Sequence, residues 1–93
     1  DTVVPTVAIS SSPTINNANV TSYTVSGSCS ENGRTVSVLV GSVSGTPTCT
    51  AGAWTTTLNV SAVSDGGSVS VTANHTDLAG NAATQASATV VKD

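Results

Sequence analysis

The sequence predicts an all-β fold built from two packed antiparallel sheets. Ser, Thr and Val number 15, 16 and 15 and together make up half of the 93 residues, whereas the helix formers Leu, Glu, Lys and Arg are scarce. Apolar and polar residues alternate in short runs separated by Gly, Asn or Pro. Such alternation places successive side chains on opposite faces of a strand, and its regular recurrence is typical of a sandwich or barrel.

Two strands are expected before residue 30. The first lies near residues 6–10, where Val7 and Ile9 share a face, and prolines suited to edges and turns flank it. An asparagine-rich loop follows. The second strand covers residues 21–29 and places Tyr23 and Cys29 in phase on its apolar face, with Val25 and Gly27 between them.

Three strands are expected in the middle of the chain. A Glu-Asn-Gly turn, a strong hairpin signal, leads to a third strand whose valines alternate from Val36 to Val40. A turn over residues 41–45 then precedes a short fourth strand that carries Cys49. The fifth strand has Trp54 at the start of its apolar face and Val60 at the end of it.

Two further strands complete the set. The sixth, over residues 68–75, places Val69, Val71, Ala73 and His75 on one face, and the seventh covers about 83–91. No 3.6-residue period persists, so no helix longer than one turn is expected. Seven strands in a single module spanning residues 1–93 predict an immunoglobulin-like β-sandwich, and the odd number of strands places the termini at opposite ends.

Composition restricts the range of partners. The chain has two basic and five acidic residues, for a net charge of −3. A nucleic-acid surface needs clustered cations, and Arg34 and Lys92 are too few and too far apart in the sequence to form such a cluster. Nucleic acid and anionic membranes are therefore not expected as partners. No apolar run reaches the roughly 20 residues of a membrane span, and no segment resembles a signal peptide.

The two cysteines predict a disulfide between Cys29 and Cys49. The alternative is a pair of buried free thiols; a metal site is disfavoured because no Cys-x-x-Cys or nearby His completes a ligand set. A disulfide in a short chain rich in Ser and Thr indicates an oxidising, extracellular compartment.

Three features together resemble the bacterial Ig-like repeats of large surface adhesins and biofilm-associated proteins. They are the opening Asp-Thr-Val-Val-Pro-Thr-Val, the Cys-Thr-Ala-Gly-Ala-Trp at residues 49–54, and the Asp-Leu-Ala-Gly-Asn-Ala at residues 77–82 before the closing Val-Lys-Asp. The resemblance covers essentially the whole chain. It implies a tandem-repeat stalk module on a bacterial cell surface or in a secreted protein, with neighbouring repeats as partners and, in some relatives, Ca²⁺ at the junctions. Written one after the other, the two ends of the sequence read as a continuous linker.

The acidic residues are the candidate metal ligands. Ca²⁺ prefers several hard oxygen ligands, and Asp93 of one copy beside Asp1 of the next, with Asp77 or Asp65 from a loop, would supply them. The simpler interpretation is that Asp65 and Asp77 form turns, because short carboxylates accept bonds from nearby backbone amides.

The remaining distinctive side chains are interpreted as structural. Trp54 and Tyr23 are in phase with their strands' apolar residues and are expected in the core, with Trp54 against the disulfide; this disfavours a carbohydrate-binding surface. His75 is expected to be a hydrogen-bonded residue at a strand end. No Gly-x-Ser-x-Gly elbow occurs, and no catalytic residue is predicted.

The function expected is therefore that of a non-enzymatic structural extender of an adhesin, monomeric as an isolated module, with Ca²⁺ as the only candidate cofactor. Two alternatives stay open. One is an Ig-like adhesion module that contacts a host protein or glycan through its loops. The other is an accessory domain of a secreted enzyme.

Overall fold

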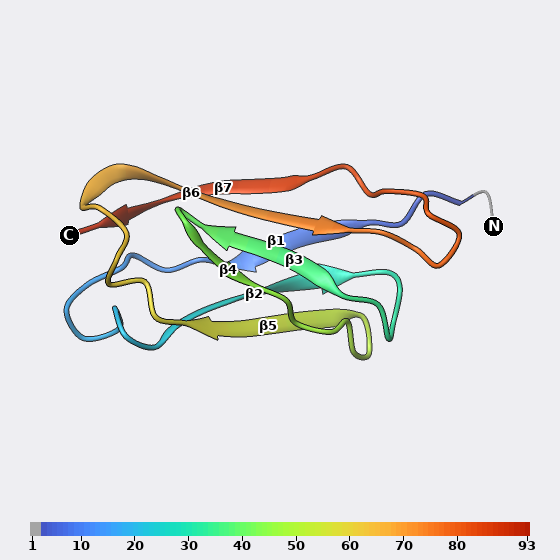
Figure 1. The fold of residues 1–93 in the computed structure, drawn as a ribbon, viewed down its shortest axis with the longest axis horizontal. Helices are drawn as coiled ribbons and strands as arrows, with labels where there is room; N and C mark the ends of the chain where they lie inside the picture. Colours follow the sequence, from blue (N-terminus) through green and yellow to red (C-terminus); the bar gives the residue numbers. More distant parts are fainter. Residues whose placement is uncertain (1–2) are drawn as a thin grey trace.

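The structure, a computed structural model, describes residues 3–93 as two antiparallel β-sheets packed face to face (Figure 1). Three strands form one sheet in the order β1-β2-β5, and four form the other in the order β4-β3-β6-β7. The strands are β1 (Val7–Ser11), β2 (Tyr23–Cys29), β3 (Val36–Val40), β4 (Val43–Gly45), β5 (Ala53–Leu58), β6 (Gly66–His75) and β7 (Ala86–Lys92). The predicted seven-strand, all-β sandwich is confirmed. The described residues contain no helix long and apolar enough to cross a membrane.

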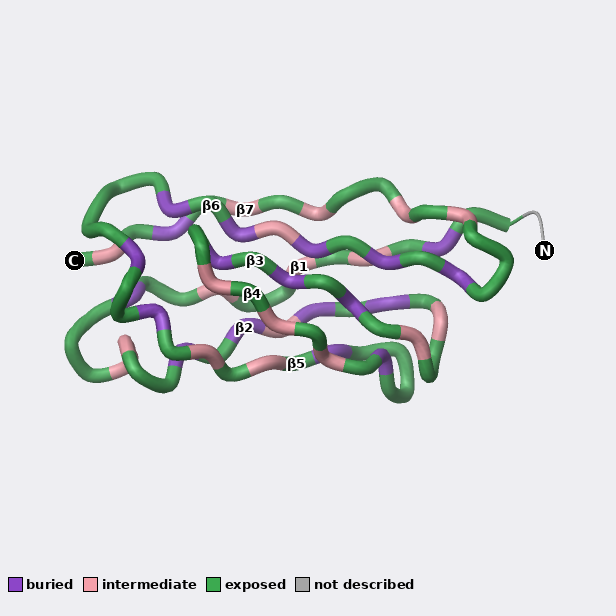
Figure 2. The backbone as a smooth tube through the Cα atoms, viewed as in Figure 1, coloured by how far each residue is buried: buried purple, intermediate pink, exposed green. Residues whose placement is uncertain are grey.

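Alternation in the sequence becomes an inner and an outer face in each sheet (Figure 2). In β2 and β3 every second residue is buried, beginning with Tyr23 and Val36. The core contains nine buried valines, and its only large rings are those of Tyr23 and Trp54. Valine suits this position because its branched side chain has few rotamers to lose and packs well on a pleated surface.

The fourth strand differs from the prediction. It covers Val43–Gly45, within the segment expected to be a turn, and pairs with Val38–Val40 across a tight hairpin. Cys49 lies in no strand; bridges on either side, Thr35 to Thr48 and Thr50 to Ala53, hold its segment. The hairpin turns at Gly41, whose φ of 60° lies in the left-handed region that favours glycine.

Pairing of β4 with β3 also sets the topology. In an immunoglobulin constant domain the fourth strand pairs with the fifth, whereas here it joins the sheet of β3, β6 and β7. Strand β5 is consequently an edge of the three-stranded sheet. The remaining pairings follow the immunoglobulin pattern.

The sandwich is elongated, with extents of 44 × 20 × 18 Å. The strands run along the long axis, and the first described residues and the C-terminus lie at opposite ends of it (Figure 1). The end near the first described residues, here called the N-end, consists of loops 30–35, 46–52 and 76–85. The other end, the C-end, consists of loops 12–22, 41–42 and 59–65 together with Asp93.

Candidate functional site

The two ends of the sandwich are the candidate functional sites, because they contain the loops, most of the charged side chains and the disulfide. At the N-end the predicted disulfide joins Cys29, the last residue of β2, to Cys49, with Cα atoms 6.0 Å apart. It connects the three-stranded sheet to the segment that runs between β4 and β5. Both cysteines are buried in the core.

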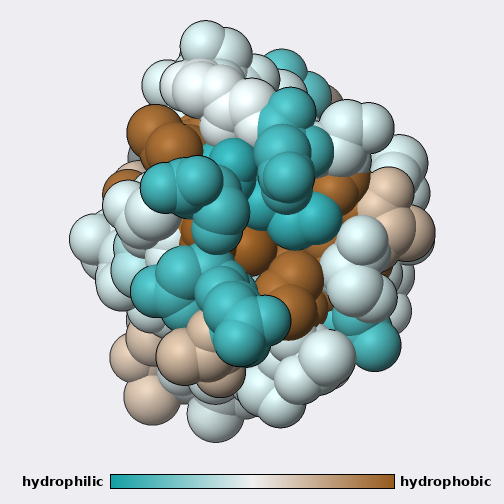
Figure 3. Space-filling model, turned by 90° about the vertical axis from the view of Figure 1, so that its left-hand side faces the viewer, coloured by the Kyte–Doolittle hydropathy of each residue, from teal (hydrophilic) through white to brown (hydrophobic). Residues whose placement is uncertain are grey.

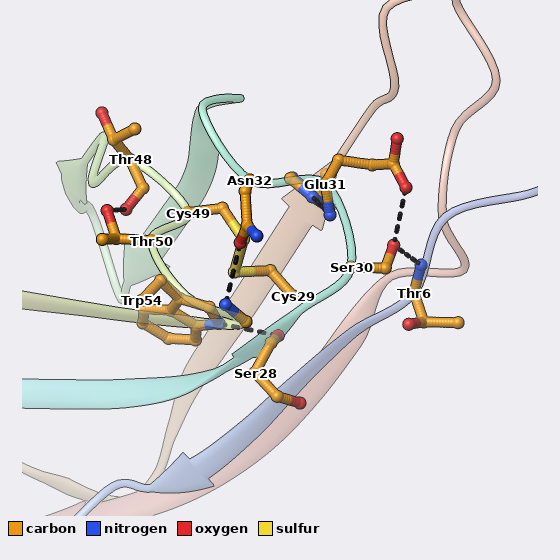
Figure 4. Close-up of a disulfide and its surroundings, with 12 residues drawn as sticks. Thr6, Ser28, Cys29, Ser30, Glu31, Asn32, Thr48, Cys49, Thr50 and Trp54 are labelled. Carbon is orange, nitrogen blue, oxygen red and sulfur yellow. Dashed lines mark hydrogen bonds between the residues drawn. A yellow bond between two sulfur atoms is a disulfide. The ribbon is translucent and has the colours of Figure 1, made fainter.

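Hydrogen bonds surround the disulfide and hold two loops together (Figure 4). The Asn32 side-chain oxygen accepts a bond from the Gly52 amide at 2.8 Å. The Gly33 amide donates to the Cys49 carbonyl, and the Cys49 amide donates to the Arg34 carbonyl, each at 2.8 Å. Loops 30–35 and 46–52 are therefore one cross-linked unit.

Trp54 and Tyr23 are both buried. The Trp54 indole nitrogen donates to the carbonyls of Ala8 and Ser28, at 3.1 and 3.2 Å, which places the ring beside the end of β2 that carries Cys29 (Figure 4). The Tyr23 hydroxyl donates to the Pro13 carbonyl at 2.6 Å, and burial raises the pKa of this phenol. Neither ring exposes a face on which a sugar could stack.

His75, the last residue of β6, is buried at the N-end of the sandwich and joins this strand to the neighbouring loop. Its Nε2 accepts a hydrogen bond from the Glu31 amide at 3.1 Å. Its Nδ1 lies 3.2 Å from the Thr35 carbonyl, which can only accept. These two contacts fit the tautomer with its proton on Nδ1, and they make His75 the hydrogen-bonded residue at a strand end that the sequence predicts.

Asp77 is buried in the loop between β6 and β7, and its carboxylate organises that loop. One carboxylate oxygen accepts from the Asn81 amide at 2.8 Å and the other from the Asn81 side chain at 3.0 Å. The Asn81 side chain, and then the amides of Asn81, Ala79 and Gly80, lower the pKa of Asp77 against the opposing effect of desolvation. Its oxygens are therefore already occupied by donors from its own turn.

Substitution of Asp77 by Asn is expected to destabilise the protein at neutral pH. Because the pKa of Asp77 is lower in the folded state than in the unfolded state, its stabilising effect is complete above the unfolded pKa and is lost as the pH falls through the folded pKa. The difference in unfolding free energy between wild type and Asp77→Asn should shrink over that acidic window. Urea denaturation at a series of pH values measures it.

Asp65→Asn is the matched control for this prediction. Asp65 is 79% exposed, and among residues 3–93 its carboxylate has Lys92 as its partner, at 3.6 Å. We expect Asp65→Asn to change stability less than Asp77→Asn at neutral pH, since exposed ion pairs contribute little. Equal effects of the two substitutions at every pH would contradict the role assigned to Asp77.

Arg34 links the disulfide-bonded loops to the loop of Asp77. Its guanidinium donates to the carbonyls of Thr76 and Asp77, at 3.4 Å each. With His75, this contact connects all three loops of the N-end. In the sequence Arg34 serves only as evidence against nucleic acid, and this role is not predicted; the signal available was a lone cation within a hairpin turn.

At the C-end Lys92 links loops to one another, as Arg34 does at the N-end. Its ammonium donates to the carbonyls of Val63 and Ser61 and contacts Asp65, so it fastens the loop between β5 and β6 to the last strand. The amide of Asp93 donates to the Ile15 carbonyl, and the Ile15 amide donates to Val91. These bonds attach the loop after β1 to the same strand.

The fold divides the described candidate calcium ligands between the two ends of the sandwich. Asp65 and Asp93 line one hollow at the C-end, Asp77 lies at the N-end, and Asp1 is outside the described residues. Asp65 and Asp77 are therefore not at the same end of one copy. Within residues 3–93 no three acidic, His or Cys side chains are grouped as metal ligands.

Within the described part of the chain, Asp65 also does not make the turn hydrogen bonds expected from the sequence. Its carboxylate contacts Lys92 and bonds no amide of its own turn within residues 3–93.

Comparison of the chain with models of protein families, with curated proteins and with solved structures finds no match. The geometry of the two ends is therefore the basis of the functional argument.

Proposed function

We propose that this chain is a structural extender module of a tandem-repeat bacterial surface adhesin, exported to the cell surface or secreted. The observation that carries the proposal is the position of the first described residues relative to Asp93. They lie at opposite poles of a 44 Å long sandwich whose strands follow the long axis. Copies joined end to end would add their lengths.

The hydrogen bonds near the C-terminus support a load-bearing role. Ile15 forms a parallel bridge with Lys92, so a segment near the N-terminus is bonded directly to the last strand. A pull on the two ends loads these bonds together, in shear along the strands. The disulfide further limits extension, because the 20-residue separation between Cys29 and Cys49 cannot be drawn out.

The surface also suits a module surrounded by copies of itself. The outer faces carry hydroxyls, such as the Thr24–Thr57 pair across β2 and β5, whose oxygens lie 3.0 Å apart. Exposed edges and apolar patches would promote pairing between neighbouring copies. A hydroxyl-rich surface with few apolar groups limits that hazard.

Small-angle scattering of a chain in which a second copy follows Asp93 directly tests the proposal. We expect a maximum dimension close to twice the 44 Å length of one copy. A two-copy chain folded back to about the length of one copy would contradict the extender role and favour a loop-mediated binding function.

The calcium part of the proposal has a separate readout. We infer that Asp65 and Asp93 of one copy bind Ca²⁺ together with Asp1 of the next, since these carboxylates would meet at the junction. Millimolar Ca²⁺ should then lengthen and stiffen the two-copy chain relative to EGTA. Identical scattering in both conditions would remove calcium from the junction and leave the extender role intact.

A further inference from the structure

Leu78 is an apolar side chain with no place in the core. At 85% exposed, it is the most exposed large apolar residue in the described part of the chain, and it lies at the N-end in the loop of Asp77. The loop backbone beside it is held by the Asp77 carboxylate, which accepts from the Asn81 amide, and by the bond from the Gly80 amide to the Asp77 carbonyl, at 3.1 Å. A backbone held in this way reduces the ordering that a contact through the Leu78 side chain would cost.

The C-end has a hollow that complements such a group. Its volume is about 330 Å³; Val20 is the apolar residue of its lining, and the others are Asn16, Asn17, Ser61, Asp65, Lys92 and Asp93. Viewed end-on, apolar surface is visible at the centre of this end, surrounded by hydrophilic side chains (Figure 3). The volume is at the lower end of the ~300–1,000 Å³ of small-molecule sites and leaves room for one aliphatic side chain.

We propose that Leu78 of one copy inserts into the C-end hollow of the copy before it. This inference rests on the proposed tandem arrangement, which brings the two ends together along a common axis. The contact also offers one pairing of opposite charges, although Glu31 and Asp77 share the N-end with Arg34, and Lys92 contacts Asp65 at the C-end. Arg34, bonded to the carbonyl of Asp77 next to Leu78, would face the carboxylates of Asp65 and Asp93 at the rim of the hollow.

The expected strength of the contact explains why it needs a tether. Burying one leucine contributes roughly 1.5–3 kcal/mol, whereas association of free molecules costs about 4–15 kcal/mol in lost freedom. Separate copies should therefore stay monomeric. A short linker raises the effective concentration to the order of millimolar, so a weak contact can be populated between neighbours in one chain.

A two-copy chain tests the inference with a matched pair of variants. Leu78→Ser in the second copy removes the side chain at the junction, whereas Leu78→Ser in the first copy alters an identical residue at the free outer end. We measure ¹⁵N relaxation of both copies. Wild type and the first-copy variant should tumble as one rigid rod, and in the second-copy variant the correlation time should fall toward that of a single copy.

Two outcomes would overturn the contact. One is equal tumbling of the two variants, and the other is independent tumbling of the copies in the wild-type two-copy chain. Neither outcome shortens the chain, so the extender role, which scattering tests by length, would stand. Trp54 fluorescence checks that both variants are folded, and a folding defect would appear in both because the substitution is the same.

Discussion

Reduction of the Cys29–Cys49 disulfide is expected to lower the free energy of unfolding by about 3 kcal/mol. The bond closes a loop of 20 residues, and in the chain-entropy model a loop of this size restricts the unfolded chain by about that amount. Small domains have ~5–15 kcal/mol of stability in total. The disulfide therefore contributes a large share of the stability of this valine-rich core.

Urea denaturation with and without dithiothreitol measures the effect, with the fluorescence of Trp54 as the signal. The Cys29→Ala, Cys49→Ala double variant is the control, because reductant should not change its unfolding midpoint. Mass spectrometry after alkylation verifies that the wild-type thiols are free in the reduced sample. An unchanged midpoint for verified reduced protein would show that hydrogen bonds around the loops, such as that from Gly52 to Asn32, suffice without the bond.

Most strands could be predicted because their alternation is long and regular. From Tyr23 to Cys29 and from Val36 to Val40 every inward residue is apolar or glycine, so a one-residue shift would expose the whole set. The boundaries at Val7 and Lys92 differ from the prediction by one residue each. Strand ends depend on loop hydrogen bonds, which alternation does not report.

The fourth strand could not be predicted, because a glycine such as Gly45 usually indicates a turn, whereas here it lies within a strand. It lies in β4, where an added Cβ would be 2.9 Å from side-chain atoms of Leu58 and Thr56. Glycine at this position permits the close approach of β4 and β5. A glycine required by packing between sheets and one required by a turn look the same in a sequence.

The candidate sites could be predicted in part. The residue types of the Asp-Leu-Ala-Gly-Asn loop indicate the turn that Asp77 forms, and Leu78, outside any alternating run, could have been identified as exposed. Asp65 and Asp77 lie at opposite ends because one strand, β6, lies between them in the sequence, and each strand carries the chain to the opposite end. The loop contacts of Arg34 and Lys92 require the three-dimensional fold.

Gly27→Ala is expected to destabilise the protein by about 3 kcal/mol or more, at or above the upper end of typical overpacking costs. Gly27 lies in β2 opposite Trp54 of β5. An added Cβ would be 1.8 Å from the Ala8 carbonyl oxygen and 2.8 Å from the indole ring. Because one of these neighbours is backbone, relief requires β1 to move away from β2.

The same movement would disrupt the indole hydrogen bonds. Trp54 donates to Ala8 of β1 and to Ser28, the residue after Gly27, and a displaced ring would leave a buried N–H without its acceptors. An unpaired buried donor adds ~1–3 kcal/mol to the cost. The substitution should therefore lower stability and red-shift the Trp54 emission in the folded state.

Gly67→Ala is the control, since an added Cβ at Gly67 meets no atom within 4 Å and its φ is not in the left-handed region. A change of less than about 0.5 kcal/mol is expected there, as at other unconstrained surface positions. Thermal and urea unfolding of both variants, followed by Trp54 emission, compare the two positions directly. If Gly27→Ala is as stable as Gly67→Ala, the sheets tolerate a Cβ beneath the indole, and glycine at residue 27 is not what allows Trp54 to reach the carbonyls of Ala8 and Ser28.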